Sequence, residues 1–462
     1  MKLFFSLLVI ILLSLDINCQ NNAEHIPWKL KGAEKRIEQY RKGDAKLKFI
    51  LNDTSIQLSK SKLSINLSKH DFKFGVSMTQ ARRLYRTKDY EEYLSKLDDV
   101  FNYTTLGLYW YLTDERNNYY HNVEEYLENV IKWLKNKNIT IKGHPLIWHE
   151  SLPKWVRNFK DMDELDKLIK DRIKNLILKY PQIEHWDVYN EPVAPFKNHV
   201  ESNGVTRWVK YKGGIYPTMI ELYNLVNEID SLKYYTNNHY NAKDPDFYKL
   251  NDFFVEEGIN FQAIGIQAHM QTDDNILSEK ELWNILEDYS IFGKDIQLTE
   301  VTVTSSKRFK NWKDHQIFLK KRENQDINEK KITLPSLPEY EDFQANYLKD
   351  FYTLAFSHPS VSSITFWNLT DRNAWRGHAG GLLFEDLEPK KAYLMLKNLI
   401  KKEWSTNVSA EIDLSKDFSF NGFYGQYLGE ISIEGENYLF SFHHSRNNKE
   451  ILEIPLNRVY EK

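Results

Sequence analysis

Hydrophobic and polar residues follow two alternating patterns along most of the chain. In longer stretches such as Val123–Lys135 and Asp163–Lys179, apolar residues recur every three or four positions, which indicates amphipathic helices. Between these stretches lie eight short apolar runs that are candidate strands: Phe72–Val76, Val100–Leu106, Thr140–Trp148, His185–Asn190, Lys233–Asn237, Ala263–His269, Ile296–Glu300 and Ser363–Trp367. Eight strands, each followed by a helix, describe a closed barrel. We therefore predict the α/β class, with a (β/α)8 TIM barrel over residues 71–402.

The two ends of the chain carry a different pattern, with apolar residues at every second position. Residues 34–70 include Leu47–Leu51 and Leu63–Leu67. Residues 403–462 include three more such runs, at Phe418–Tyr427, Glu430–Glu434 and Tyr438–His443, joined by turns that contain glycine. Either end alone offers too few strands to bury one face of a sheet. We therefore predict that both ends together build one small accessory β-domain.

The first residues resemble an export signal. Lys2 is followed by an apolar run from Leu3 to Leu15, which is too short to span a bilayer. We predict a signal peptide over residues 1–19, a secreted or periplasmic mature protein, and no integral membrane segment after cleavage. Cys19 is the only cysteine. A cysteine at this position could carry a lipid anchor, but Asp16 and Asn18 match a lipobox poorly. Lipid anchoring through Cys19 and simple cleavage therefore both stay open.

Composition narrows the range of partners. The chain has 462 residues, enough for a barrel and an appendage, and its 62 basic and 65 acidic side chains give a net charge of −3. Such a balance creates no field that attracts nucleic acid, so we expect no nucleic-acid partner. Aromatic residues are abundant, with 12 Trp, 28 Tyr and 25 Phe. Such rings stack on sugars or fill cores, and composition does not separate these uses or reveal the oligomeric state.

Two short segments carry the clearest chemical signal. His185–Pro192 and Ile296–Val301 each place a glutamate, Glu191 and Glu300, at the end of an apolar, β-prone run. A carboxylate at the point where a buried strand meets a loop faces a cleft, and a glycosidic bond is usually cut by two such groups. The segments therefore predict a glycosidase with Glu191 and Glu300 as its catalytic pair.

Other chemistry-bearing residues have simpler explanations. His144, His149 and His269 are not spaced with cysteines or carboxylates as metal ligands usually are, so we expect no metal and no cofactor. We interpret His149 as structural and Trp155 as a core residue, while Trp110 and Trp148 fit either a core or a site. The long connection Ser305–Pro338 holds nine Lys or Arg and four Asp or Glu between Lys307 and Lys331. It is either a solvated helical face, which we favour, or a loop that contacts an acidic glycan.

Five motifs in order resemble those of glycoside hydrolase family 10, whose members are mainly retaining endo-1,4-β-xylanases on a (β/α)8 barrel. The motifs are Gly143–His149, Trp186–Glu191, Gly265–His269, Leu298–Glu300 and Phe366–Arg372 with Trp375. The resemblance runs from about Phe72 to Lys402. The opening Arg36–Ala45 also resembles a subgroup with a small β-module before the barrel.

The resemblance implies a role for each matching residue. Glu191 matches the acid/base, Glu300 the nucleophile, and His269 a histidine that hydrogen-bonds the nucleophile. Asn190 matches a residue that binds the sugar 2-hydroxyl. His144, Trp148 and Gln267 match residues that contact the sugar near the cleavage point. Trp367 and Trp375 match aromatic rings that form the wall of the cleft at this point. Retention of configuration would require the two carboxyl groups to lie about 5 to 5.5 Å apart.

One segment departs from the family pattern. Typical xylanases carry Glu-Asn and, three residues later, Lys after the second strand, where these side chains bind sugars on the non-reducing side of the cut. Here the stretch Thr105–Leu112 reads TLGLYWYL. The loss of hydrogen-bonding groups from a site usually changes its preference between substrates by a large factor. This departure therefore puts the xylan specificity in question.

Three hypotheses follow from these residues. The first is a secreted retaining endo-β-glycosidase, endo-1,4-β-xylanase-like, acting on xylan or a xylose-containing polysaccharide. The second keeps this chemistry on a different β-linked glycan, including acidic algal or plant glycans. The third is a non-catalytic carbohydrate-binding protein, against which the intact glutamate pair argues, because binding alone needs neither an acid nor a nucleophile.

Overall fold

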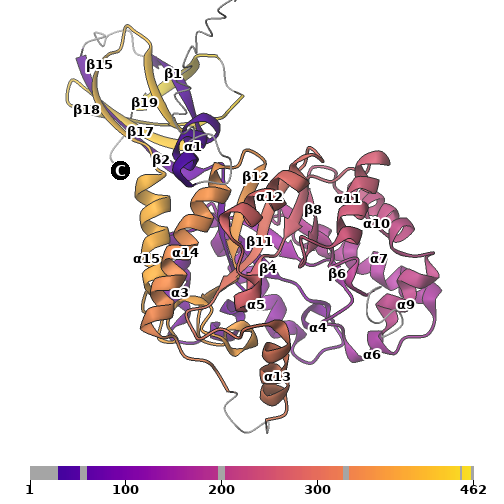
Figure 1. Ribbon diagram of the computed structural model, residues 1–462. Helices are drawn as coiled ribbons and strands as arrows, with labels where there is room; N and C mark the ends of the chain where they lie inside the picture. Colours follow the sequence, from indigo (N-terminus) through magenta and orange to yellow (C-terminus); the bar gives the residue numbers. More distant parts are fainter. Residues whose placement is uncertain (1–29, 52–59, 196–202, 326–331, 448–449, 459–462) are drawn as a thin grey trace, which may run out of the picture.

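The computed structural model describes residues 30–51, 60–195, 203–325, 332–447 and 450–458 (Figure 1). The predicted signal peptide and Cys19 lie outside these residues, so they stay predictions. Within the described part the chain forms a barrel and a smaller β-domain (Figure 1).

The barrel consists, in the described residues, of eight parallel strands that close on themselves. In hydrogen-bonded order they are β3 (Lys73–Ser77), β4 (Tyr103–Gly107), β5 (Thr140–His144), β7 (His185–Asn190), β8 (Tyr234–His239), β9 (Ala263–Ile266), β11 (Asp295–Val303) and β12 (Val361–Phe366). Pairing of β12 with β3 and of β11 with β9 completes the circle. The predicted (β/α)8 barrel is confirmed.

Helices cover the outside of the barrel. The outer ring is α3 (Tyr90–Asp98), α5 (Tyr120–Asn136), α7 (Met162–Lys179), α10 (Ile215–Ile229), α11 (Pro245–Glu256), α12 (Glu279–Ser290), α14 (Pro338–Ser357) and α15 (Lys391–Asn398). In α7, Asp161 caps the first turn by accepting a hydrogen bond from the Glu164 amide, and the residues at three- and four-residue spacing face the core. Shorter helices in the connections are α2 (Ala81–Leu84), α4 (Trp110–Thr113), α6 (Lys154–Arg157), α9 (Gly204–Tyr211) and α13 (Trp312–Glu323).

Two predicted strands are broken in the structure. Thr140–Trp148 divides into β5 and β6 (Ile147–Trp148), because Pro145 lacks the backbone N–H that a ladder needs. Ala263–His269 divides into β9 and β10 (His269–Met270), and Ala268 between them has a φ of 57°. A residue in this left-handed conformation cannot continue a strand. Both breaks lie where the strands reach the mouth of the barrel.

The accessory domain is a seven-stranded sheet built from both chain ends, as the sequence predicts. Its described strands run in the order β15 (Asn407–Asp413), β2 (Lys60–His70), β17 (Gly425–Ile433), β18 (Glu436–His444), β19 (Leu452–Arg458), β1 (Lys42–Leu51) and β16 (Phe418–Phe423). The alternating apolar residues form a separate core that includes Leu47, Ile65, Ile431 and Phe440. In contrast to the predicted strand segment, residues 33–41 form the helix α1 (Ala33–Arg41).

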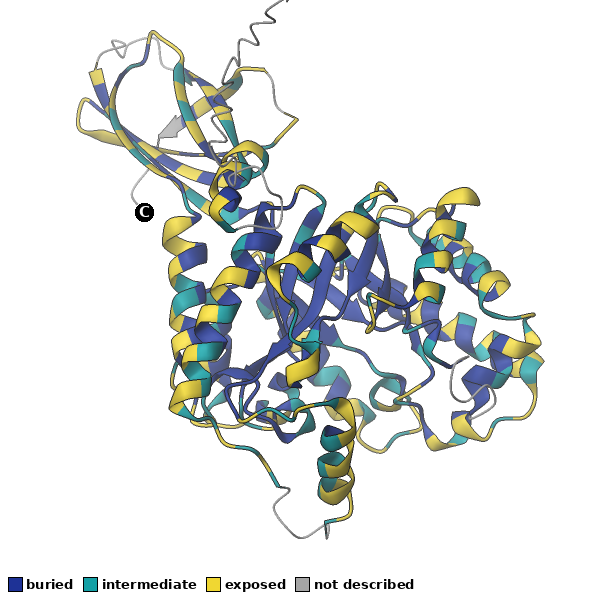
Figure 2. Cartoon of the chain, viewed as in Figure 1, coloured by how far each residue is buried: buried dark blue, intermediate teal, exposed yellow. Residues whose placement is uncertain are grey.

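The accessory domain lies at the end of the barrel where the strands begin. Strand β2 ends at His70 and β3 begins at Lys73, and α1 packs beside the buried barrel in Figures 1 and 2. The Arg41 guanidinium of α1 donates to three barrel carbonyls, those of Phe356 at 2.6 Å, His358 at 2.6 Å and Val361 at 2.7 Å. The Arg41 side chain therefore links the accessory domain to the barrel. This link lies at the end of the barrel opposite the C-terminal ends of its strands.

We predict that Arg41→Ala lowers the free energy of unfolding by about 2 to 4 kcal/mol, because three carbonyls lose a charged donor. Chemical denaturation followed by circular dichroism would measure this change. Gln39→Ala, an exposed position on the same helix, is the matched control and should change stability by less than about 0.5 kcal/mol. Equal stability of the two variants would contradict the role of Arg41.

Candidate active site

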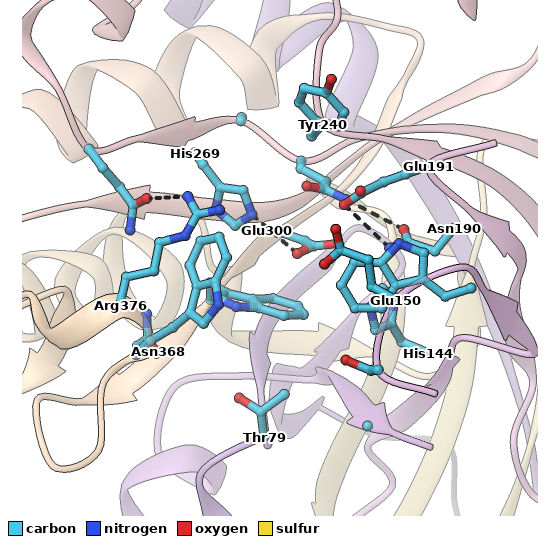
Figure 3. A pocket seen from close by; sticks show the side chains of 18 of the residues that line it. Thr79, His144, Glu150, Asn190, Glu191, Tyr240, His269, Glu300, Asn368 and Arg376 are labelled. Atoms are coloured by element: carbon cyan, nitrogen blue, oxygen red, sulfur yellow. Dashed lines mark hydrogen bonds and ion pairs between the residues drawn. The ribbon is translucent and has the colours of Figure 1, made fainter. Parts of the chain in front are cut away.

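A cleft of about 1530 Å³ opens where the barrel strands end, and all of its described lining residues fall between Met78 and Arg376. Figure 3 shows Glu191 and Glu300 within it, approached by side chains from several strands. The closed barrel brings them together, since β7 and β11 end at the same mouth. The accessory domain contributes none of the described residues that line this cleft.

Glu191 follows β7 in a strained conformation, with a φ of 58°. Its amide donates to the Asn238 carbonyl at 2.8 Å, and its Oε1 accepts from Gln267 Nε2 at 2.9 Å. Burial raises the pKa of Glu191 to about 7, and the charge of Glu300 adds to this effect, while the Gln267 hydrogen bond opposes it. The carboxyl group can therefore hold a proton in near-neutral solution and can also release it.

Glu300 is a buried residue of β11 with two side-chain partners. Its Oε1 accepts from Asn238 Nδ2 at 3.0 Å, and its Oε2 lies 3.2 Å from His269 Nε2. The two partners approach different oxygens, so the orientation of the carboxylate is held. This arrangement suits a group that presents one oxygen to a bound substrate.

Amide side chains connect the two glutamates. Asn238 Nδ2 donates both to Glu300 and, at 2.9 Å, to Asn190 Oδ1. Gln267 Nε2, which donates to Glu191, lies 3.4 Å from the same Asn190 oxygen. Thr299 Oγ1 donates to Asn238 Oδ1 at 2.7 Å and thereby fixes which way this amide points. Residues on β7, β8 and β11, together with Gln267 directly after β9, thus share one network.

Sequence reasoning missed Asn238, although a signal for it existed. The predicted fifth strand ended at Asn237, whereas β8 continues to His239. The polar run Asn237–His239 at the end of a barrel strand is the position where site residues gather.

His269 contacts both Glu300 and Thr302, another residue that the sequence analysis missed. Nδ1 of His269 lies 3.0 Å from Thr302 Oγ1. Burial lowers the pKa of His269, and the nearby charges of Arg376 and His144 act in the same direction, although Glu300 opposes them. A neutral imidazole has one N–H. The proton on Nε2 then faces Glu300, which leaves Nδ1 as an acceptor for the Thr302 hydroxyl. The same hydroxyl lies 3.2 Å from the Glu300 carbonyl oxygen, its other acceptor.

His144 is supported from behind by a buried ion pair. Its Nδ1 lies 2.8 Å from Asp187 Oδ2, and the other Asp187 oxygen lies 2.6 Å from Lys142 Nζ. Burial alone would lower the pKa of His144, but the hydrogen bond to Asp187 and the charge of Glu300 outweigh it and raise the pKa. The imidazole therefore favours its charged form, with Nδ1 donating to Asp187.

Aromatic rings wall the cleft. Trp148, Trp367 and Trp375 all line it, and the Trp375 ring lies 4.5 Å from that of His269. The Trp367 ring lies between histidines, 5.6 Å from His144 and 6.1 Å from His269. All seven residues predicted to bind substrate, His144, Trp148, Asn190, Gln267, His269, Trp367 and Trp375, thus line this one cleft.

The segment that departs from the family pattern also lines the cleft, through Tyr109, Tyr111 and Leu112. The Tyr109 ring lies 5.6 Å from His144 and 6.0 Å from Trp148. Burial, together with the charges of Glu300 and Glu191, holds the pKa of Tyr109 well above its usual value. The hydroxyl therefore stays protonated, and this wall offers aromatic surface without charged groups.

The remaining candidates lie near the site or outside it. His149 lines the cleft but is buried, and burial lowers its pKa to about 4. Trp110 is a core residue, while Trp155 is half-buried and donates to Asp114 at 2.8 Å. Within the described ranges, no three His, Cys, Asp or Glu side chains are grouped to hold a metal ion. Among the helices described, none is long and apolar enough to cross a bilayer.

A comparison with the sequence profiles of known families shows to which family the chain belongs. The profile described as Glycosyl hydrolase family 10 matches residues 63–399. The chain belongs to glycosyl hydrolase family 10. The matched residues contain all eight barrel strands and the whole cleft lining.

Relatives and solved structures agree with the family. The chain is 23% identical over 428 residues to the anti-sigma-I factor RsgI6 of Acetivibrio thermocellus, covering 89% of this chain but only 47% of that protein. It is 24% identical over 342 residues to endo-1,4-beta-xylanase B of Thermotoga neapolitana, covering 71% of this chain and 89% of the relative. The chain thus spans about half the length of the first of these relatives.

Solved structures of xylanases share the barrel. Xylanase 10B from Thermotoga petrophila, in complex with xylobiose, aligns with a TM-score of 0.55 at 22% identity, over 72% of this chain and 95% of that one. A family 10 structure from Paenibacillus barcinonensis aligns with a TM-score of 0.54 at 18% identity, over 71% and 95%. At such identities the likeness establishes the fold.

We predict that Glu300→Gln lowers the pKa of Glu191, because a negative charge that disfavours its ionised form is removed. Carbon-13 NMR titration of the glutamate carboxyls would measure the shift. Glu150→Gln, which removes a more weakly acting charge at the exposed rim, should lower the pKa by less. An unchanged or higher pKa in Glu300→Gln would contradict the coupling.

We predict that Thr302→Val disturbs the tautomer of His269, because the only side-chain partner described for its Nδ1 is lost. Nitrogen-15 NMR of the imidazole should show the Nε2–H form in the wild type and in Thr302→Ser, which keeps the hydroxyl. Thr302→Val should show a mixture. A wild-type spectrum with the proton on Nδ1 would contradict this assignment.

Proposed function

We propose that the protein is a retaining endo-β-glycosidase, endo-1,4-β-xylanase-like, that hydrolyses xylan or a xylose-containing polysaccharide. The observation that carries this proposal is the coupled pair in the cleft: Glu191 with a pKa raised to about 7, and Glu300 held by His269 and Asn238. Two carboxyl groups in such different environments suit an acid and a nucleophile. Membership of the family supports the same chemistry.

The first step would form a covalent intermediate. An oxygen of Glu300 attacks the anomeric carbon, the bond from this carbon to the leaving oxygen breaks, and Glu191 gives its proton to that oxygen. His269 and Asn238 hold the attacking carboxylate in place while the ester forms. Asn190, fixed by Asn238, offers its amide to the sugar hydroxyl beside the reacting carbon.

The second step would release the sugar. Glu191, now ionised, removes a proton from a water molecule, whose oxygen attacks the anomeric carbon and frees Glu300. Two inversions leave the configuration unchanged. Because Glu191 acts first as an acid and then as a base, a pKa near neutrality serves both steps.

A different β-linked glycan is the second candidate substrate, and one observation favours it. Tyr109, Tyr111 and Leu112 line the cleft where typical xylanases carry charged and amide groups. A site without those groups lacks the hydrogen bonds by which typical xylanases hold sugars on the non-reducing side of the cut. A non-catalytic binding role would need neither a glutamate with a raised pKa nor a second carboxylate oriented by Asn238 and His269.

Export is also a proposal. The apolar run from Leu3 to Leu15 after Lys2 supports it, and a polysaccharide substrate would be met outside the cell. Mass spectrometry of the mature protein would locate the cleavage site and would detect a lipid on Cys19.

We predict that Glu300→Ala lowers kcat on the preferred glycan by a factor on the order of 10⁴ or more, because no nucleophile remains. Binding of the glycan should persist. Proton NMR of the first product released by the wild type should show the β-anomer. Full hydrolysis by Glu300→Ala would reject the assignment, and an α-anomer would reject retention.

We predict that kcat/KM falls as the pH rises through about 7, because the protonated form of Glu191 is then lost. The pH profile on a soluble glycan would measure this alkaline limb. Glu150→Gln should move the limb to lower pH, since removing a negative charge lowers the pKa of Glu191. If the alkaline limb of Glu150→Gln lay at the same pH as that of the wild type, the limb would not report the ionisation of Glu191.

A panel of xylan, mixed-linkage glucans and acidic algal and plant glycans, scored by reducing-end release, would separate the two candidate substrates. Release from xylan alone supports the first proposal. Release from another β-glycan without release from xylan supports the second.

A further inference from the structure

Helix α13 is an insertion after β11 that packs against the turn following β13 (Asn368–Thr370). Three contacts join them. The Trp312 ring lies over the Arg376 guanidinium at 4.8 Å, and His315 Nε2 lies 2.7 Å from His378 Nε2. The Arg322 side chain lies against Gly377, whose φ of 71° and close neighbours leave no room for a Cβ.

The contact between the two histidines holds α13 in place at neutral pH. Burial lowers the pKa of His315 to about 4 and that of His378 to about 3, and the charge of Arg376 acts in the same direction on both. In the neutral pair one ring nitrogen donates its proton and the other accepts it. The position of α13 beside the cleft is therefore supported rather than loose.

A continuous stack leads from α13 to the catalytic carboxylate. The Arg376 guanidinium lies 3.8 Å from the centre of the Trp375 ring, and the Trp375 ring lies 4.5 Å from that of His269, which contacts Glu300. Figure 3 labels Arg376 and His269 among the residues that line the pocket. Trp312 ends this stack at the outer rim.

Trp312 is exposed in an unusual way for so large an apolar ring. It lines the cleft, yet 41% of its surface remains accessible. Arg376 holds it from one side through a cation–π contact, so little freedom would be lost when a ligand stacks on it. A rigid exposed indole in a glycan cleft suits the apolar face of a sugar ring.

We propose that Trp312 is a platform for a distal pyranose ring of the glycan chain, several sugar units from the cleaved bond. This inference rests on the proposed function and extends it: the insertion lengthens the cleft beyond the catalytic pair. The sequence analysis favoured a solvated face for this segment. The exposed Lys313, Lys320 and Lys321 fit that interpretation, whereas Trp312 and Arg322 of the same helix line the cleft.

The alternative is that Trp312 only shields Arg376 and keeps Trp375 in place. The two roles differ in what they change. A platform affects only ligands long enough to reach it and changes KM. A shield acts through Trp375 and His269, and its loss would lower kcat for short and long substrates alike.

Steady-state kinetics on xylo-oligosaccharides of increasing length and on a short aryl β-xyloside would decide between these roles. For Trp312→Ala we expect KM to rise roughly 3- to 10-fold on the long substrates, with kcat and the short substrate unchanged. Trp312→Phe should keep most of the affinity. Ile317→Ala removes another exposed apolar side chain of α13, one that is 61% exposed and outside the cleft lining, and should change nothing.

A fall in kcat of Trp312→Ala on every substrate would overturn the proposal, and so would an unchanged KM on long chains. If the wild type cleaves no glycan, the proposed function fails and a binding experiment still tests the platform. Glu300→Gln and the double variant Glu300→Gln, Trp312→Ala would then be compared by native gels containing soluble β-glycans. Weaker retardation of the double variant supports the platform, and equal retardation rejects it.

Discussion

Two carboxyl groups that repel each other when both are charged share one cleft, and this repulsion is the constraint on which the site depends. It is relieved in two ways. Glu191 can stay neutral, because burial and the charge of Glu300 raise its pKa to about 7, whereas Glu300 receives donors from Asn238 and His269. The two groups thus have different surroundings: burial and a neighbouring charge raise the pKa of Glu191, whereas side-chain donors hold the Glu300 carboxylate in place.

The supporting residues come from strands that are distant in sequence and adjacent in the barrel. Asn238 on β8 bridges Asn190 on β7 and Glu300 on β11, so its single amide group fixes both partners. Behind His144, the buried Lys142 and Asp187 balance each other's charge. Such groups are costly to bury singly and acceptable as a connected set.

The contacts that stabilise the molecule and the loops that shape the cleft lie at opposite ends of the barrel. The accessory domain meets the barrel where the strands begin, through Arg41, and none of its described residues lines the cleft. At the opposite end, two additions shape the cleft: the aromatic wall at Tyr109 and Tyr111, and helix α13 with Trp312. The catalytic centre can thus stay the same while the loops around it change the substrate.

Features that depend on local pattern could be predicted from the amino-acid sequence. Apolar runs and amphipathic spacing predicted the barrel and the two-ended β-domain, and short motifs at strand ends predicted Glu191, Glu300 and the residues around them, because a strand end marks a site without any knowledge of contacts. Only the tertiary structure showed Asn238 as the bridge, Thr302 as the partner of His269, and Trp312 on Arg376. Their roles come from side chains that barrel closure brings together across many residues of chain, and a single sequence carries no record of such distant pairings.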